Sequence, residues 1–242
     1  MIKRMLNLIF PSSCNICSSL IKNGSNFVIC DNCWDGIIPL KQPYCPICAR
    51  PFVSKKALSN SPEHICGICR SSRIYYTKVI AVCLYEGVLR EAIHLFKYNK
   101  KISLAAPLGN LLYNRLKEEY YPADMIFPVP LHVKRLRERE FNQSYLLGQR
   151  VGRYLNIPVI PDNLMRVRWT RPQVELNRKE RVRNVKGVFY LRDHNAVKKR
   201  KILLIDDVYT TGSTVNECAR VLKEADAKEV YVLILARMDY NG

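Results

Sequence analysis

The chain has 242 residues, of which 48% are hydrophobic, and it carries 39 Lys and Arg against 21 Asp and Glu, a formal net charge of +18. This length predicts one medium-sized domain or two small ones with a real core, and no apolar run approaches the ~20 residues of a transmembrane segment. The excess of positive charge favours polyanionic partners such as nucleotides, nucleic acids or anionic lipids. The alternative is a solvated basic surface that aids solubility.

The first 13 residues combine a basic start with a short apolar patch. The patch is too short for a signal peptide, and no small-residue cleavage site follows it. We therefore expect a cytoplasmic protein.

Eight of the ten cysteines form four Cys-x-x-Cys pairs, namely Cys14/Cys17, Cys30/Cys33, Cys45/Cys48 and Cys66/Cys69. Each pair can offer two thiolates to one metal ion, and two pairs complete a tetrahedral four-cysteine zinc site. Disulfides are the rival interpretation, but a reducing cytoplasm keeps thiols free. A redox role for one pair is conceivable, yet four successive pairs favour structural zinc, about two ions per chain.

Two pairings of these cysteines are compatible with the spacing. Consecutive pairing gives two separate zinc ribbons, whereas alternate pairing gives a cross-brace. We favour consecutive pairing because short loops cost less entropy to close. The remaining cysteines, Cys83 and Cys218, lie in apolar patterns and are expected to be buried.

From about residue 74, predicted strands alternate with predicted helices. Strands are expected at 78–85, 124–129, 201–205 and 230–236, and helices at 88–97, 102–119, 141–155 and 213–225, whereas residues 163–190 are expected to be irregular and basic. This alternation indicates an α/β fold with βαβ units and a mainly parallel sheet. We expect a zinc-binding region at 1–73 and an α/β domain at 74–242.

The most informative stretch is ILLIDDVYTTGST at 202–214. Four apolar residues of a buried strand run into Asp206 and Asp207, and a loop rich in hydroxyl groups leads into a helix. Gly212 allows close backbone approach, and the new helix directs free N–H groups toward the loop, which suits a phosphate group. The acids can accept hydrogen bonds from the hydroxyls of a sugar. An ordinary strand, loop and capped helix is the alternative.

This stretch resembles the phosphoribosyltransferase signature. The resemblance implies a site for phosphoribosyl pyrophosphate (PRPP) with Mg²⁺, in which Asp206 and Asp207 hold the ribose hydroxyls. The 5′-phosphate would be bound by the loop formed by Thr210, Thr211, Gly212, Ser213 and Thr214.

Three further stretches, at 94–101, 127–144 and 168–189, resemble sequence motifs of one family that contains this signature. Together with the cysteine pairs they resemble the ComF family of phosphoribosyltransferase-like proteins, over essentially the whole chain. The resemblance implies a type I phosphoribosyltransferase-like domain, with helices on both faces of its sheet, behind a small zinc module with four-cysteine sites. It adds Lys97, Pro130 and Leu131 to the PRPP site and makes Asp206, Asp207 and Arg139 the catalytic groups of an active enzyme. Glu140 stands where the family usually has Gly. A glutamate would be strained there at a positive φ, and its charge would repel pyrophosphate.

The family is implicated in DNA uptake during natural competence, or in the use of DNA. Residues 132–187 carry 14 Lys and Arg against 5 Asp and Glu, a net charge of +9. We therefore predict a PRPP-binding protein that contacts single-stranded DNA, in part through Arg178, Lys179, Arg181 and Arg183, and that acts with other competence proteins. Alternatively, these arginines serve only the nucleotide site, and the chain is an active phosphoribosyltransferase on an unknown acceptor with no direct role on DNA.

Overall fold

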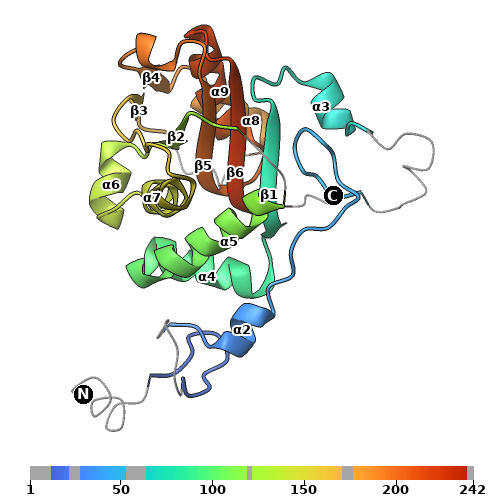
Figure 1. Ribbon diagram of the computed structural model, residues 1–242, viewed down its shortest axis with the longest axis vertical. Helices are drawn as coiled ribbons and strands as arrows, with labels where there is room; N and C mark the ends of the chain where they lie inside the picture. The colour runs from blue at the N-terminus through green and yellow to red at the C-terminus, as the bar shows by residue number, and fades with distance from the viewer. Residues whose placement is uncertain (1–11, 22–27, 53–63, 119–121, 171–176, 239–242) are drawn as a thin grey trace.

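The computed structural model describes residues 12–21, 28–52, 64–118, 122–170 and 177–238. Its centre is a four-stranded parallel sheet in the order β1-β6-β5-β2, formed by β1 (Lys78–Leu84), β2 (Met125–Pro128), β5 (Lys201–Tyr209) and β6 (Glu229–Arg237) (Figure 1). The four strands that the sequence predicts in the α/β region are therefore all present, and the fold class is confirmed. Among the described residues, no helix combines the length and apolar content needed to cross a bilayer.

Helices cover both faces of this sheet. One face packs against α4 (Gly87–Tyr98), α5 (Ala105–Lys117) and α7 (Gln143–Leu155), and the other packs against α9 (Ser213–Glu224). The residues of β5 alternate between two cores: Leu203 and Ile205 join the first, and Ile202 and Leu204 join the second. This alternation is the two-residue period of a strand buried on both sides, and it explains why β5 reads as a continuous apolar run.

Two predicted boundaries are wrong. The strand expected to end at Ile205 continues to Tyr209, and it pairs with β6 through Asp206, Val208 and Tyr209. The two acids therefore belong to the last part of the strand. The helix expected at 102–119 begins as a 3₁₀ turn at Ile102–Leu104 and continues as α5.

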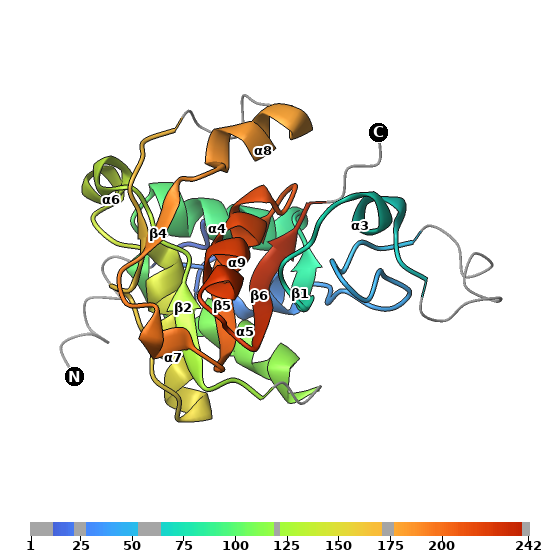
Figure 2. The same ribbon diagram turned by 90° about the horizontal axis from the view of Figure 1, so that it is seen from above.

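The segment 163–190, expected to be irregular, contains regular structure. An antiparallel pair, β3 (Leu164–Arg166) and β4 (Phe189–Leu191), encloses α8 (Arg178–Val185), which packs on α9 (Figure 2). The helix α8 begins with a capping box, in which the side chains of Asn177 and Glu180 each accept a hydrogen bond from the other's backbone N–H. The highly charged sequence has no apolar periodicity, so only the cap could have revealed the helix. We call residues 164–191 the hood.

The cysteines form two groups of four, with consecutive pairing. Within each group the Sγ atoms lie within 4.8 Å of one another, and the groups are Cys14, Cys17, Cys30, Cys33 and Cys45, Cys48, Cys66, Cys69. We call them the first and the second cysteine cluster. Their short helices, α2 (Asp31–Asp35) and α3 (Gly67–Ser71), lie on different sides of the molecule in Figure 1. Cys83 and Cys218 are buried, as predicted.

Both ribbons attach to the exposed edge of the sheet at β1. The Leu40 N–H donates to the Val82 carbonyl at 2.6 Å, and the Val79 N–H donates to the Ile47 carbonyl at 2.7 Å. The ribbons therefore cover an edge strand that would otherwise present unpaired backbone groups. Four thiolates within one small group fit tetrahedral Zn²⁺, which prefers sulfur ligands, and closed sites of this kind stabilise a fold.

We expect purified, reduced protein to contain about two zinc ions per chain, because each cluster supplies a complete set of ligands. Elemental analysis after gel filtration in chelator-free buffer measures this content. Cys45→Ser should lower it to about one ion, whereas Cys83→Ala, which removes a thiol outside both clusters, should leave it unchanged. A parent protein with less than one zinc per chain would contradict the assignment.

Candidate functional site

A pocket opens at the carboxyl end of the parallel strands, where open α/β sheets bind ligands. Its walls come from the ends of β1 and β5, from α4, from the loop after β2, from α6 (Val133–Arg139), from α7 and from the hood. The sequence-predicted residues that line it are Lys97, Pro130, Leu131, Arg139, Arg181, Asp206, Asp207, Thr210 and Thr214. Segments far apart along the chain therefore meet in one cavity.

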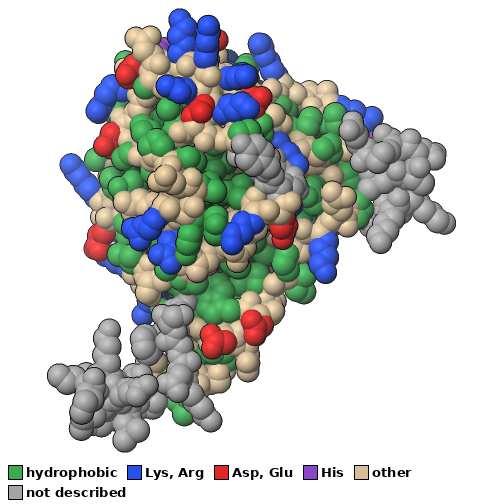
Figure 3. Space-filling view, in the orientation of Figure 1, with side chains coloured by type: hydrophobic (Ala, Val, Ile, Leu, Met, Phe, Trp, Pro, Cys, Tyr) green, Lys and Arg blue, Asp and Glu red, His purple; other side chains and the backbone are tan. Residues whose placement is uncertain are grey.

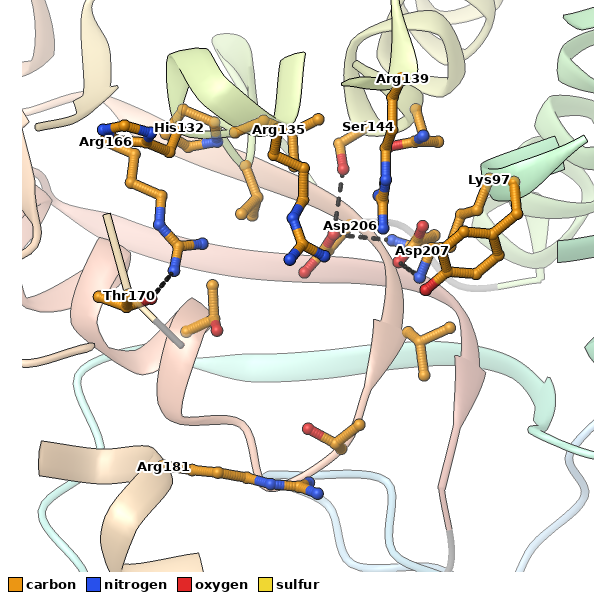
Figure 4. A pocket seen from close by; sticks show the side chains of 18 of the residues that line it. Lys97, His132, Arg135, Arg139, Ser144, Arg166, Thr170, Arg181, Asp206 and Asp207 are labelled. Carbon is orange, nitrogen blue, oxygen red and sulfur yellow. Dashed lines mark hydrogen bonds and ion pairs between the residues drawn. The ribbon is translucent and has the colours of Figure 1, made fainter. Parts of the chain in front are cut away.

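The two acids have different surroundings (Figure 4). Asp207 is only 5% exposed, and its carboxylate is paired with Lys97 Nζ at 2.8 Å. Asp206 is partly exposed and accepts a hydrogen bond from Ser144 Oγ, at the start of α7, at 3.0 Å. Asp206 is therefore partly exposed in the pocket, whereas Asp207 is buried and paired because α4 brings Lys97 to it.

The Asp206 carboxyl is harder to ionise than an ordinary aspartate. Burial and the neighbouring charge of Asp207 raise its pKa from 3.8 to about 7, although Lys97, the Asp207 N–H and Ser144 act in the opposite direction. This carboxyl therefore changes its protonation near neutral pH.

The loop at 210–214 has the geometry of an anion cradle. Gly212 adopts a φ of +79°, and a Cβ there would lie 2.1 Å from Tyr209 Oη, so only glycine fits. The helix α9 begins directly afterwards at Ser213, whose hydroxyl lies 3.0 Å from Thr211 Oγ1. Thr210 and Thr214 line the pocket, whereas Thr211, Gly212 and Ser213 are not among its lining residues and shape the turn between them.

Four arginines supply positive charge around the acids. Figure 4 shows Arg135 and Arg139 pointing toward Asp206 and Asp207 from one side, while Arg181 reaches into the cavity from the opposite side. Arg139 Nη1 donates to Gln143 Oε1 at 3.0 Å, and its guanidinium stacks on Tyr98 at 5.2 Å. Arg166, the fourth, donates to Thr170 Oγ1 at 2.5 Å. Arg166 was missed at the sequence level, and only the pairing of β3 with β4 brings it here.

The pocket also has an aromatic wall that no sequence motif indicated. The ring of Trp169, in the hood, lies edge-on to the ring of His132, with the two ring centres 5.3 Å apart. The guanidinium of Arg135 lies 5.5 Å from the centre of the Trp169 ring. Tyr85 and Tyr98 line another part of the cavity. These rings offer apolar surface for a planar group beside the polar floor.

Glu140 has the backbone conformation that the sequence suggested for a glycine. It ends α6 with a φ of +69°, in the left-handed region that disfavours a side chain. Its carboxylate is exposed, forms an ion pair with Lys100, and is not among the groups that line the pocket. The backbone strain is therefore present, but the negative charge is directed elsewhere.

The four residues proposed for nucleic acid do not share one environment. Arg181 is 8% exposed and belongs to the pocket, whereas Arg183 is exposed. The side chains of Arg178 and Lys179 lie outside the described part of the structure, as do residues 1–11. A second basic surface lies at the amino ends of the strands, opposite the pocket, where Lys198, Lys199 and Arg200 precede β5. Basic side chains are densest near this end in Figure 3.

This combination of groups suits a phosphorylated sugar. The carboxylates can accept hydrogen bonds from hydroxyl groups, the loop and helix N-terminus can bind one phosphate, and the arginines can bind further phosphates. Asp206 is the carboxylate without a Lys or Arg partner among the described ion pairs, so it fits Mg²⁺ bound together with phosphate oxygens.

Asp206→Asn is expected to flatten the pH dependence of stability between about pH 4 and 7. In that window the folded protein holds a proton on Asp206 that the unfolded chain has lost, because the pKa rises from 3.8 to about 7 on folding. The parent protein should therefore lose stability as the pH rises, and Asn removes this loss. Thermal unfolding of ligand-free protein at pH 5 and pH 8 measures the difference in Tm.

The matched control is Asp226→Asn, which removes an exposed carboxylate in the turn after α9. It should leave the change in Tm between the two pH values at the parent level. The same change in Tm for the parent and for Asp206→Asn would contradict the raised pKa.

Comparisons with known proteins agree with this geometry. A double zinc ribbon domain matches residues 5–70, and a phosphoribosyl transferase domain matches residues 142–239. Among solved structures, the purine phosphoribosyltransferase from Pyrococcus horikoshii has a TM-score of 0.36 and 22% identity, covering 54% of this chain and 70% of that one.

Relatives with assigned names align over nearly the full length. The chain is 32% identical over 220 residues to the DNA utilization protein YhgH of Escherichia coli, covering 85% of this chain and 96% of that protein. It is also 32% identical over 224 residues to competence protein F of Haemophilus influenzae, covering 90% and 92%. Because the chain is 32% identical to these relatives over 85% or more of its length and carries both the double zinc ribbon and the phosphoribosyl transferase domain, it belongs to the ComF family of phosphoribosyltransferase-like proteins.

Proposed function

We propose that this protein binds PRPP together with Mg²⁺ in the pocket and acts in DNA uptake or DNA use, in contact with single-stranded DNA. The observation that carries the proposal is the meeting of Asp206, Asp207 and the 210–214 loop with Lys97 and the arginines in one cavity. PRPP needs both parts, since it joins a ribose with vicinal hydroxyls to a phosphate and a pyrophosphate. The names of the relatives, competence protein F and DNA utilization protein YhgH, support the cellular role.

In this proposal each part of the pocket binds one part of PRPP. Asp206 and Asp207 hold the ribose hydroxyls, and the 210–214 loop binds the 5′-phosphate. Pro130, Leu131 and Arg139 lie on the side of the pyrophosphate, where arginines offset the negative charge. Lys97 pairs with Asp207 and holds its carboxylate in place. Mg²⁺ would supply charge neutralisation at the pyrophosphate, with Asp206 as the nearby protein carboxylate.

An active phosphoribosyltransferase is the second candidate, and the position of Glu140 favours it. Its carboxylate is paired with Lys100 and is absent from the pocket lining, so it does not repel the pyrophosphate directly. In such a reaction the bond from ribose C1 to the pyrophosphate oxygen breaks, and its electron pair leaves with pyrophosphate. The acceptor forms the new bond to C1 and releases its proton to solvent.

The contact with DNA is proposed from charge and from the family. The hood contributes exposed cations such as Arg183, and its Trp169 forms part of the aromatic wall of the pocket. Single strands bind to grooves that combine positive charge with aromatic side chains. We further propose that residues 1–73 and 74–242 are the two structural units, and that the protein is cytoplasmic, where zinc-binding thiols stay reduced.

Asp206→Ala combined with Asp207→Ala should abolish PRPP binding, because it removes both acceptors for the ribose hydroxyls and leaves Lys97 unpaired. Isothermal titration of PRPP in the presence of Mg²⁺ measures the loss. Circular dichroism should show that the fold survives. The exposed Asp226→Asn variant serves as the control and should bind like the parent. Unchanged PRPP affinity in the double variant would refute this assignment of the site.

Binding of single-stranded DNA should weaken steeply with salt, with a log–log slope of about −0.7 per neutralised phosphate. Replacing Arg178, Lys179, Arg181 and Arg183 by Glu should reduce both the affinity and the slope, measured by fluorescence anisotropy of a labelled oligonucleotide. The matched control replaces Arg192, Lys198, Lys199 and Arg200 by Glu. This control variant changes the net charge by the same amount as the hood variant, but on exposed residues away from the pocket, so it should still bind single-stranded DNA.

Single variants separate DNA binding from PRPP binding. Arg181→Glu should weaken PRPP binding because Arg181 lines the pocket, whereas Arg183→Glu should weaken DNA binding alone. If the affinity for DNA is insensitive to salt, or if the hood quadruple variant loses PRPP but binds DNA normally, the hood arginines belong to the nucleotide site only.

A further inference from the structure

The two cysteine clusters differ in their relation to the pocket. The first belongs to the core on the α4 face of the sheet, and its Cys17 is exposed. The second is buried at all four cysteines and shares a core with Tyr76, Tyr209 and α9. Tyr209 and α9 flank the 210–214 loop, so the second cluster is continuous with the structure beneath the phosphate cradle.

A buried arginine packs against Tyr209, the residue of β5 that this core shares with the loop. Arg237, the last residue of β6, is 5% exposed, and its Nε and Nη1 atoms have no hydrogen-bond partner among the described residues. Its guanidinium stacks on the Tyr209 ring at 4.7 Å, and Tyr209 shares a core with the four cysteines of the second cluster. A buried cation without a counter-charge is unfavourable, so its retention here requires a negative partner.

The second cluster provides that negative partner once it holds a metal ion. A divalent ion bound by four thiolates leaves a net charge of about −2. The positive charge of the Arg237 guanidinium can offset part of this negative charge.

Tyr209 connects Arg237 to the loop. Its hydroxyl is hydrogen-bonded to Tyr76 Oη at 2.8 Å, and its ring lies directly beneath Gly212, so closely that a Cβ on the glycine would overlap the ring. A second connection runs through Asn216 of α9. Its side chain accepts from the Tyr75 N–H at 2.9 Å and donates to the Arg73 carbonyl at 3.0 Å, just after the last cysteine of the cluster.

We propose that Arg237 is a positioning residue for two sites at once: it balances the charge of the metal–thiolate centre at the second cluster, and through Tyr209 it supports the 210–214 loop. Metal binding at the second cluster and ligand binding at the loop are therefore coupled, whereas the first cluster is independent of the loop. The part concerning the ligand rests on the proposed binding of PRPP. Coupling of this kind is reciprocal, so ligand binding also retains the metal.

The test uses the full chain carrying Cys14→Ser and Cys17→Ser, so that only the second cluster holds zinc. In this background Arg237→Met keeps the length of the side chain and removes its charge. Zinc should then transfer about tenfold faster to a chromogenic chelator. Arg237→Lys should restore slow transfer, and Arg200→Met, at an exposed arginine, should match the background. Equal release rates for Arg237→Met and the background would overturn the role of Arg237 at the metal.

Hydrogen–deuterium exchange of residues 210–216 tests the link to the loop without any need for PRPP. Removing zinc from the second cluster, or introducing Arg237→Met, should speed exchange of these amides, whereas Cys14→Ser with Cys17→Ser should leave it unchanged. Unaltered exchange in the zinc-depleted protein would refute the coupling.

Titration of PRPP with Mg²⁺ then supplies a separate result. If the parent binds PRPP, Arg237→Met should weaken the affinity by about fivefold or more, and an unchanged affinity would contradict the coupling. If the parent does not bind PRPP, the proposed function fails, while zinc release and exchange still decide the role of Arg237. If Arg237→Met does not fold, the exchange measurement uses Arg237→Lys, which keeps the charge but removes the planar group that stacks on Tyr209. Faster exchange at 210–216 in this variant supports the role of the stack, and unchanged exchange contradicts it.

Discussion

The ion pair between Lys97 and Asp207 is the contact on which the arrangement of the site depends. Both side chains are largely buried, with 16% and 8% of their surface exposed, and their charged atoms lie 2.8 Å apart. A buried carboxylate is costly unless it is paired, so the end of β5 can carry two adjacent acids only because α4 places a cation there. Lys97 lies in the last turn of α4, where a positive charge also favours the helix.

This pairing gives the two acids different properties. Asp207 is fixed by Lys97. Asp206 accepts hydrogen bonds from the Ser144 hydroxyl and the Asp207 N–H, and burial together with the charge of Asp207 raises its pKa to about 7. Two neighbouring carboxylates repel each other, and the repulsion falls on the one with the weaker partners. A ligand that brings Mg²⁺ or hydroxyl groups to Asp206 would relieve this cost, which explains how a site can be stable without its ligand and still be suited to bind it.

The rest of the molecule supports this edge of the sheet from several directions. The zinc-binding region covers β1 through two backbone hydrogen bonds, from the Leu40 N–H to Val82 and from the Val79 N–H of β1 to Ile47, and the second cluster shares a core with Tyr209 beneath the loop. The hood brings Arg166, Trp169 and Arg181 over the cavity from a segment that is neither in the sheet nor in its covering helices. The pocket thus has a rigid floor made by the strand end and a wall of charged and aromatic side chains made by the hood.

The sequence alone determined the features that depend on local pattern. The spacing of the cysteine pairs predicted both clusters, and the apolar run before Asp206 and Asp207 predicted a buried strand that leads into the loop at 210–214, because these signals lie within a few residues of one another. The ligand class remains a prediction. The division into units at residue 73 and the roles of the site residues remain predictions. Only the tertiary structure decided which cation pairs with Asp207, that Glu140 pairs with Lys100, that β3 pairs with β4 in the hood, and that Arg237 stacks on Tyr209. These contacts join residues that are far apart along the chain, and their partners are chosen by the packing of helices and strands, which no short pattern encodes.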